Sequence, residues 1–300
     1  LKGKFRDWFI FDAIPTWKKY GVDRNNGGFI EALDKTLKPL ESPRRTRVIC
    51  RQIYVFTFAY EFSKDKDIKK IISDGYRFLL LKLRCENGFF SYSYSNLSKT
   101  NDKKVFLYEQ AFVIFLLATL FKFDNRQYFE TLEIAKNLLI KIKDRWFSRK
   151  FQESKLLVDQ YQTDPYMHLL EGLLLWEEVL ENTNFSNQNS EFKKLSDHIV
   201  NLVISKCIDK KYGFIAEEYS FDWSKLNHEY LNIEPGHQFE WSWLLVKWSR
   251  SRNYTEEIKI HILKLINFAE KYGIDKESLL VVDSISSKFE ILKPVEINIK

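Results

Sequence analysis

The sequence predicts an all-α fold, an (α/α)6 toroid or barrel with short β-hairpins between its helices. Turn segments recur along the chain at a nearly constant spacing of 60, 62, 63 and 65 residues, as expected of a repeated supersecondary unit. The helical patterns between these turns alternate in character. The aligned turn positions are Phe29, Phe89, Phe151, Phe214 and Leu279, and the third and fifth copies lack the glycine of the others.

Two helices are predicted in each repeat, and they differ in where their apolar residues fall. One kind is apolar on most faces, as expected of a helix surrounded by protein, whereas the other carries a charged face and an apolar stripe. An inner ring of the first kind inside an outer ring of the second is an α/α toroid, and a superhelical solenoid is the alternative. The inner helices are expected at 48–62, 105–121, 166–176 and 239–248, and the outer ones at 67–83, 126–143, 191–206 and 255–271.

Residues 1–300 are expected to form a single α/α-barrel domain with its last repeat or repeats missing. The five turn segments account for about nine to ten of the twelve helices that a closed ring of six helical pairs requires. An open ring would expose apolar surface of inner helices, and such surface commonly marks an interface. Either a homodimer or further helices of a longer gene product would cover it.

Composition excludes several classes of protein. The net charge of +6 comes from acidic and basic residues interspersed along the chain, which favours a solvated surface over nucleic-acid binding. No apolar run approaches the roughly 18 residues that a membrane span needs. No secretory signal is visible at the N-terminus, so a cytoplasmic location is predicted. The local cluster Arg44, Arg45, Arg47 and Arg51 would either meet an anionic substrate group or cap a surface.

Polar residues recur near the starts of the predicted inner helices. Burying such groups without partners costs roughly 1 to 3 kcal/mol each, so their repetition at one end indicates a polar pocket or a mutual hydrogen-bond network. The pocket is the favoured interpretation. These residues are Arg51, Gln52, Tyr108, Glu109, Gln110, His168, Glu171, His237 and Glu240.

Two His-x-x-Glu pairs, His168 with Glu171 and His237 with Glu240, each follow a proline at a predicted helix start. The positive end of a helix disfavours imidazolium, so each imidazole is expected to be neutral and able to accept a proton near pH 7. The glutamate one turn later would orient the ring. A lone histidine on a helix is more often structural, but two copies of one arrangement favour a shared site.

Two opposed histidines suit the abstraction of a proton next to a carbonyl and its return to another carbon or face. Two histidines and two glutamates could instead hold a divalent ion. Carboxylate metal sites in helical bundles use Glu-x-x-His, however, and the order here is reversed, so no metal is expected. No cofactor is expected either, because phosphate-cradling loops, dinucleotide fingerprints and nucleophile elbows are missing from the sequence. Four aromatic residues would stack on a sugar or belong to the core: Tyr54, Tyr108, Trp241 and Trp243.

At these residues the chain resembles the N-acylglucosamine 2-epimerase superfamily, which includes cellobiose 2-epimerases, mannose isomerases and proteins named mannose-6-phosphate isomerases. The resemblance extends in order along almost the whole chain. It rests on Asp23-x-x-x-Gly27-Gly-Phe-x-Glu31, Arg45-x-Arg47-Val-x-x-Arg51-Gln-x-Tyr54-Val-Phe, Leu107-Tyr108-Glu-Gln-Ala-Phe112, Pro165-x-Met-His168-Leu-x-Glu171 and Glu234-Pro-Gly-His237-x-Phe-Glu240-Trp.

The resemblance implies a metal-independent enzyme that opens a sugar ring and moves a proton at C2 through an enediol or enolate. It implies His237 as the acid/base, oriented by Glu240, with His168 and Glu171 assisting ring opening or holding hydroxyls. Arg51 would polarise the carbonyl and Tyr108 would contact the sugar.

The ligand implied is a small sugar or sugar phosphate. The motif around Arg51 looks most like the mannose or mannose-phosphate isomerase branch, which favours aldose–ketose isomerisation. The alternatives are an N-acylglucosamine or cellobiose 2-epimerase, an inactive sugar-binding protein, and an α/α-barrel glycoside hydrolase, which would need an inward carboxylic acid.

Asp164 departs from the family pattern, in which asparagine usually precedes the proline. As an expected substrate-binding residue, it adds a negative charge beside His168. That charge would raise the pKa of His168 or alter substrate preference.

Overall fold

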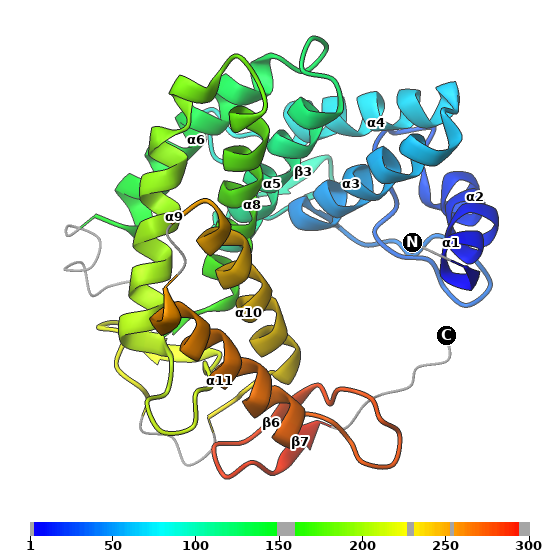
Figure 1. The fold of residues 1–300 in the computed structure, drawn as a ribbon. Coiled ribbons are helices and arrows are strands. Elements are labelled where there is room, and N and C mark those ends of the chain that lie inside the picture. The colour runs from blue at the N-terminus through cyan, green and yellow to red at the C-terminus, as the bar shows by residue number, and fades with distance from the viewer. Residues whose placement is uncertain (1–2, 149–159, 227–230, 253–254, 294–300) are drawn as a thin grey trace. The chain divides into compact units, whose positions relative to one another are not determined.

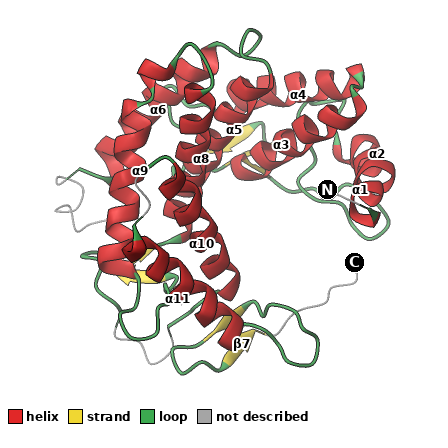
Figure 2. Cartoon of the chain, in the orientation of Figure 1, coloured by secondary structure: helices red, strands yellow, loops and turns green. Residues whose placement is uncertain are grey.

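A computed structural model describes residues 3–148, 160–226, 231–252 and 255–293. The chain divides into two compact units, residues 1–142 and 143–300, and each is described by itself. Helices joined by loops dominate both units, and strands are confined to short segments (Figure 2). Among the described residues, no helix combines the length and apolar character that crossing a membrane would require.

The first unit contains three consecutive long helices, and a fourth long helix extends past the last residue of the unit (Figure 1). They are α3 (Thr46–Ser63), α4 (Lys66–Phe78, continued by the π-helical η3, Leu79–Leu83), α5 (Leu107–Phe123) and α6 (Glu130–Trp146). The sequence analysis assigned no structure to the N-terminal α1 (Lys4–Trp8), η1 (Phe9–Ala13), α2 (Ile14–Thr16) and η2 (Trp17–Gly21). A three-stranded antiparallel sheet runs β1 (Arg44–Arg45), β2 (Ser93–Ser95), β3 (Thr100–Asp102).

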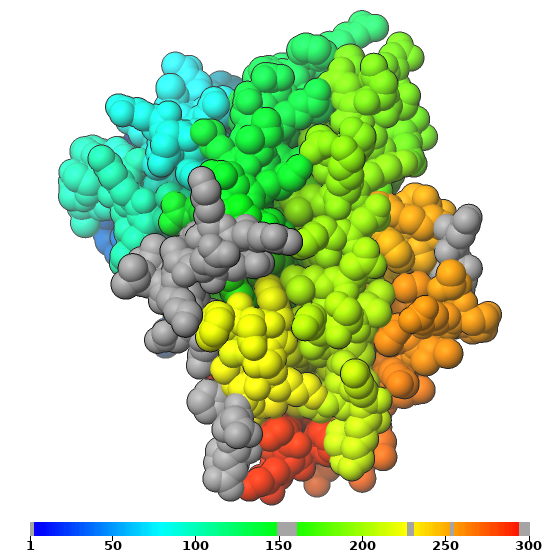
Figure 3. All heavy atoms as spheres, turned by 90° about the vertical axis from the view of Figure 1, so that its left-hand side faces the viewer, coloured from blue at the N-terminus to red at the C-terminus, as the bar shows by residue number. Residues whose placement is uncertain are grey.

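In the second unit α8 packs against α9 and α10, and α10 packs against α11 (Figure 1). α9 forms part of the outer surface of this unit, seen as yellow-green atoms in Figure 3. The helices are α8 (Asp164–Glu181), α9 (Ser190–Leu202, continued by η5, Val203–Cys207), α10 (Pro235–Arg250) and α11 (Glu256–Tyr272), with a 3-10 turn η4 (Ser186–Gln188). The antiparallel strand pairs are β4 (Gln160–Gln162) with β5 (Glu218–Ser220) and β6 (Ser284–Ile285) with β7 (Ile291–Lys293).

All eight helices expected from the sequence are present, with ends that differ by a few residues. Burial follows the predicted alternation, since α5 is buried on nearly every face while α4 buries an apolar stripe and exposes its charged residues. The turn expected at Phe151 lies outside the described residues. A single domain over residues 1–300 stays a prediction.

Glycine shapes the recurring turns. Gly27, Gly88 and Gly213 have φ angles of 80°, 82° and 81°, in the left-handed region that a side chain disfavours. In the fifth turn Leu279 takes this conformation, with φ 57°. The turn residues form single antiparallel bridges to the chain before them, such as Val22 with Phe29, rather than extended hairpins.

In α3, α5 and α10 a glutamine near the start of the helix bonds the helix to the preceding turn. The side chain of Gln110 accepts from Phe90 N–H at 2.9 Å and donates to Phe90 C=O at 2.8 Å. Gln238 makes the same pair of bonds with Ile215, at 2.8 and 2.9 Å. Gln52 and Gln110, expected near a pocket, are therefore engaged in holding the backbone, because buried backbone groups need partners.

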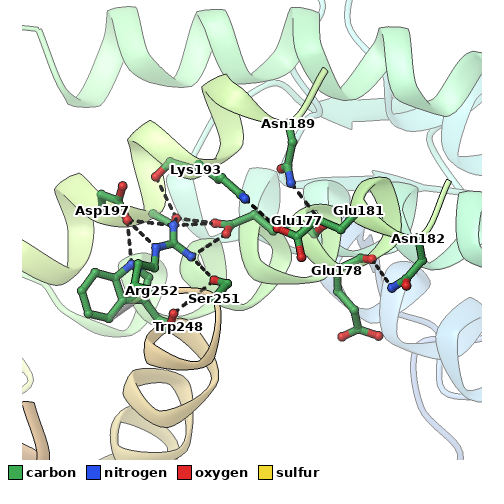
Figure 4. Close-up of polar contacts among 11 residues, drawn as sticks. Glu177, Glu178, Glu181, Asn182, Asn189, Lys193, Asp197, Trp248, Ser251 and Arg252 are labelled. Carbon is green, nitrogen blue, oxygen red and sulfur yellow. Dashed lines mark hydrogen bonds and ion pairs between the residues drawn. The ribbon is translucent and has the colours of Figure 1, made fainter. Parts of the chain in front are cut away.

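A buried ion-pair cluster joins the far ends of α8 and α10 to α9 (Figure 4). Glu177 of α8 is 2% exposed, and Arg252, just after α10, donates to it from Nη1 at 2.6 Å. Arg252 Nε and Trp248 Nε1 each donate to Asp197 of α9 at 2.8 Å. Removing Arg252 would leave the buried charge of Glu177 uncompensated.

We expect Arg252→Met to lower the free energy of unfolding by about 3 to 5 kcal/mol, because Glu177 would stay buried without its counter-charge. Urea denaturation measures this loss. The double variant Glu177→Met/Arg252→Met should recover most of it. As a matched control, Lys259→Met breaks a surface pair with Glu256 and should cost no more than about 1 kcal/mol. Equal losses in the two single variants would contradict the assignment.

Candidate functional site

The short segment from Ile215 to Glu217 lies between the starts of α8 and α10 and is bonded to both. Thr163, the residue before α8, donates its N–H to Glu217 C=O and its hydroxyl to Ala216 C=O, both at 3.0 Å. Gln238 of α10 holds Ile215 from the other side. The segment therefore fixes the Glu217 side chain relative to both histidine-bearing helices.

His237 lies in the first turn of α10 with a carboxylate at each ring nitrogen. Its Nδ1 is 2.9 Å from Glu217 Oε2, and its Nε2 is 3.4 Å from Glu234 Oε2. The other oxygen of Glu217 accepts the backbone N–H of Glu234 at 3.3 Å. Because Glu217 is held through both oxygens, it fixes the orientation of the ring.

His168 lies in the second turn of α8, and its ring is also placed between two carboxylates. Nε2 is 3.1 Å from Asp164 Oδ1, and Nδ1 is 3.4 Å from Glu171 Oε2. The predicted contact of Glu171 with His168 is thus present. Burial lowers the pKa of His168, but the two carboxylates outweigh it and raise that pKa above its usual value, as the sequence suggested for Asp164.

The two imidazoles belong to one cluster of the second unit. α8 packs against α10, and the Thr163–Glu217 hydrogen bond ties the start of one helix to the partner of the histidine on the other. The charge of Asp164 contributes to the raised pKa of His237 as well as to that of His168. Four carboxylates and two imidazoles therefore share one electrostatic environment.

The protonation state of His237 differs from the neutral imidazole expected at a helix start. Burial lowers its pKa, but the hydrogen bond and charge of Glu217, with Glu234 and Asp164, raise it to about 9. Burial also raises the pKa of Glu217, against the effect of His237. At neutral pH the ring of His237 is therefore an imidazolium, because nearby carboxylates outweigh the helix dipole.

Glu240 does not orient His237, contrary to the expectation from its i, i+3 spacing. The side chain of Glu240 is exposed, and the ring contacts Glu217 and Glu234 instead. Helical side chains lean toward the helix N-terminus, so a residue in the first turn meets groups that precede it. Whether Glu240 binds substrate stays a prediction.

Sequence reasoning missed Glu217 and gave no role to Glu234. Glu217 is 20 residues before His237, and no local spacing connects the two. Its signal was the turn at Phe214, which placed the following residues beside an inner helix. Glu234 opens the Glu-Pro-Gly-His stretch, where it forms the N-cap of α10.

The same residues form the candidate metal cluster of the described chain. Ligand atoms of Glu217, Glu234 and His237 lie within 4.8 Å of one another. A divalent ion would need a neutral imidazole, whereas the carboxylates here favour a protonated one. The same three donors could hold a divalent ion if it displaced the proton of His237.

Arg51 and Tyr108 lie in the first unit. Arg51 is exposed, with its guanidinium 4.3 Å from the centre of the Phe112 ring. The half-buried Tyr108 lies with its ring 5.1 Å from the Arg47 guanidinium. Their convergence with the histidines of the second unit stays a prediction. The other arginines of the cluster form ion pairs: Arg44 with Asp23, Arg45 with Glu31 and Arg47 with the buried Glu109.

The aromatic candidates separate by exposure. Trp241 is buried in the core at 1% exposure, whereas Tyr54 and Trp243 are 41% and 51% exposed. Trp241 is thus a packing residue.

Comparison with known proteins identifies relatives of the chain. The chain is 28% identical over 297 residues to a mannose-6-phosphate isomerase of Rhizobium meliloti (strain 1021), covering 97% of this chain and 75% of that protein. It is 25% identical over 263 residues to a cellobiose 2-epimerase of Dictyoglomus turgidum (strain DSM 6724 / Z-1310), covering 82% of this chain and 64% of that protein.

A solved D-mannose isomerase superimposes with a TM-score of 0.79 at 16% identity, covering 98% of this chain and 77% of that one. This likeness confirms the α/α-toroid fold class predicted from the sequence. Residues 27–293 match the N-acylglucosamine 2-epimerase (GlcNAc 2-epimerase) family. The chain therefore belongs to the N-acylglucosamine 2-epimerase family of sugar isomerases and epimerases.

Proposed function

We propose that this chain moves a proton at C2 of a small sugar by histidine acid/base catalysis, in a mannose-type aldose–ketose isomerisation. One observation carries the proposal: two imidazoles of the second unit, each between two carboxylates, are joined through the Thr163–Glu217 hydrogen bond. The relative named mannose-6-phosphate isomerase favours isomerisation, whereas the one named cellobiose 2-epimerase supports epimerisation as the alternative.

His237 acts as the base through Nε2. Nδ1 is engaged by the buried Glu217, so Nε2 is the nitrogen left to accept a proton from a substrate carbon. The proton of C2 moves to Nε2, the C–H electron pair forms the C1=C2 bond, and the carbonyl electrons move to O1. For a ketose, O1 takes up a proton, the O2 hydroxyl gives one up, and the proton on Nε2 returns to C1. For an epimer, the electrons on O1 re-form the C1 carbonyl as a proton is delivered to the other face of C2.

His168 supplies the proton that the developing oxygen anion needs. Asp164 and Glu171 hold the ring as an imidazolium, which is a hydrogen-bond donor at both nitrogens. In this role it protonates the ring oxygen on opening or stabilises O1 of the enediolate. Asp164 and Glu171 accept sugar hydroxyls with their remaining lone pairs.

The net negative charge of this cluster affects which sugars it can bind. Four carboxylates outnumber two imidazolium groups, so the cluster suits the hydroxyls of a neutral sugar and disfavours a phosphate beside it. A phosphate would have to meet cations outside this cluster. A cytoplasmic location and a homodimer stay predictions from the sequence.

We expect the chain to exchange the C2 proton of D-mannose, mannose 6-phosphate, N-acetylmannosamine or cellobiose for deuterium in heavy water. His237→Ala should lower that exchange by about 10²- to 10⁴-fold, because the base is lost. Proton NMR follows both the exchange and the product, a ketose or a C2 epimer. His198→Asn, an exposed histidine of α9, is the matched control. Exchange that persists in EDTA supports the metal-free mechanism, and no exchange with any of the four sugars would contradict the proposal.

The pH dependence should be that of a base whose pKa is raised. His237 must be neutral to accept a proton and His168 must stay protonated to donate one. We therefore expect kcat/KM to rise with pH as His237, with its pKa of about 9, loses its proton, and to fall where His168 is deprotonated. Glu217→Gln removes an anion beside the ring and lowers the pKa of His237, so the rise should move to lower pH. The neighbouring Glu218→Gln should leave the profile in place. An unchanged pH profile of kcat/KM in Glu217→Gln would refute the pairing of Glu217 with His237.

A further inference from the structure

The two carboxylates that contact His237 differ in freedom. Glu217 is 10% exposed and is bonded through both oxygens, to the ring and to the Glu234 N–H. The Glu234 side chain is 41% exposed, and among the described residues its carboxylate has one polar contact, the 3.4 Å approach to Nε2. Glu217 therefore holds the ring, whereas the Glu234 carboxylate lies between the ring nitrogen and water.

The backbone of Glu234 is fixed even though its side chain is not. Its N–H donates to Glu217, and its C=O accepts from His237 N–H at 3.1 Å and from Gln238 Nε2 at 3.0 Å. The fixed backbone therefore keeps the Glu234 carboxylate near Nε2, the nitrogen that the proposed function assigns to proton transfer.

We propose that Glu234 is the partner through which the proton taken up by His237 exchanges with water while the enediol exists. This inference rests on the proposed function, because it concerns the proton removed from C2. In this role Glu234 does not orient the ring. Glu234 determines what fraction of the protons taken from C2 exchanges with solvent before a proton returns to carbon.

The exchange balances without a further reactant. The proton on Nε2 passes to Glu234, leaving a neutral imidazole and a carboxylic acid, and the acid then gives its proton to water. A proton from water returns through Glu234 to Nε2, and the substrate receives it at carbon. No electrons leave the enediol in this sequence, so only the origin of the proton changes.

The charged groups that face His237 limit the alternatives. Glu217 precedes β5, Glu234 caps α10, and Asp164 begins α8, where it contacts His168. Glu217 is buried and held at both oxygens, and Asp164 is engaged with the other imidazole. Glu234 is therefore the one of these three that combines contact with Nε2 and broad access to water.

The test uses D-mannose and mannose 6-phosphate carrying deuterium at C2, and measures by mass spectrometry the deuterium retained in the product. In Glu234→Gln the retained fraction should rise by at least about twofold, since an amide cannot carry the proton, while kcat falls by less than about tenfold. Adding acetate should restore the loss of deuterium. Glu217→Gln should alter kcat and the pH profile without raising the retained fraction.

Glu256→Gln, an exposed carboxylate of α11 that pairs only with Lys259 among the described residues, is the matched control. Glu234→Asp keeps a shorter carboxylate and should give an intermediate retained fraction, which guards against a folding defect in one variant. Turnover with the same retained fraction in wild type, Glu234→Gln and Glu234→Asp would overturn the role of Glu234 alone. If the wild-type chain neither converts nor exchanges the sugars, the proposed function fails as well.

Discussion

The arrangement of the site depends on burying the carboxylate of Glu217 against His237. The segment that carries Glu217 has no helix of its own and is held between Thr163 at the start of α8 and Gln238 in α10. A carboxylate at 10% exposure needs both a charge partner and hydrogen bonds, and Glu217 has the His237 ring and the Glu234 N–H. The fold thus couples the positions of two helices to the orientation of one imidazole.

This coupling reverses the electrostatics that a helix start alone would impose. The helix dipole favours a neutral ring, but it amounts to partial charges, whereas full negative charges lie at both ring nitrogens of His237. A strongly basic imidazole removes a carbon-bound proton more effectively once it is neutral, at the cost of being protonated in most molecules at pH 7. The fraction of neutral His237 available for the proposed proton transfer therefore increases as the pH rises toward 9.

The sequence predicted the long helices well because their apolar periodicity is strong and glycine turns separate them. It missed the N-terminal helical segments between Lys4 and Gly21, which alternate between α- and π-helical turns and include Pro15. Of the candidate site, both histidines and Glu171 were indicated by local spacing, and Asp164 by its departure from the family pattern. Glu217 was not predictable, because its contact with His237 depends on how the segment at β5 packs beside α10. Glu240 was predicted to orient the ring of His237 because residue spacing does not reveal which way a side chain leans.

The most direct test of the account is an NMR titration of the His237 imidazole in the wild-type chain and in Glu217→Gln. The account predicts that the ring titrates with a pKa near 9 in the wild type and substantially lower in the variant. Both ring nitrogens should carry protons at pH 7 in the wild type. A ring that titrates near the usual pKa of about 6.5 in both proteins would show that Glu217 does not hold His237, and the assignment of the reactive nitrogen would fall with it.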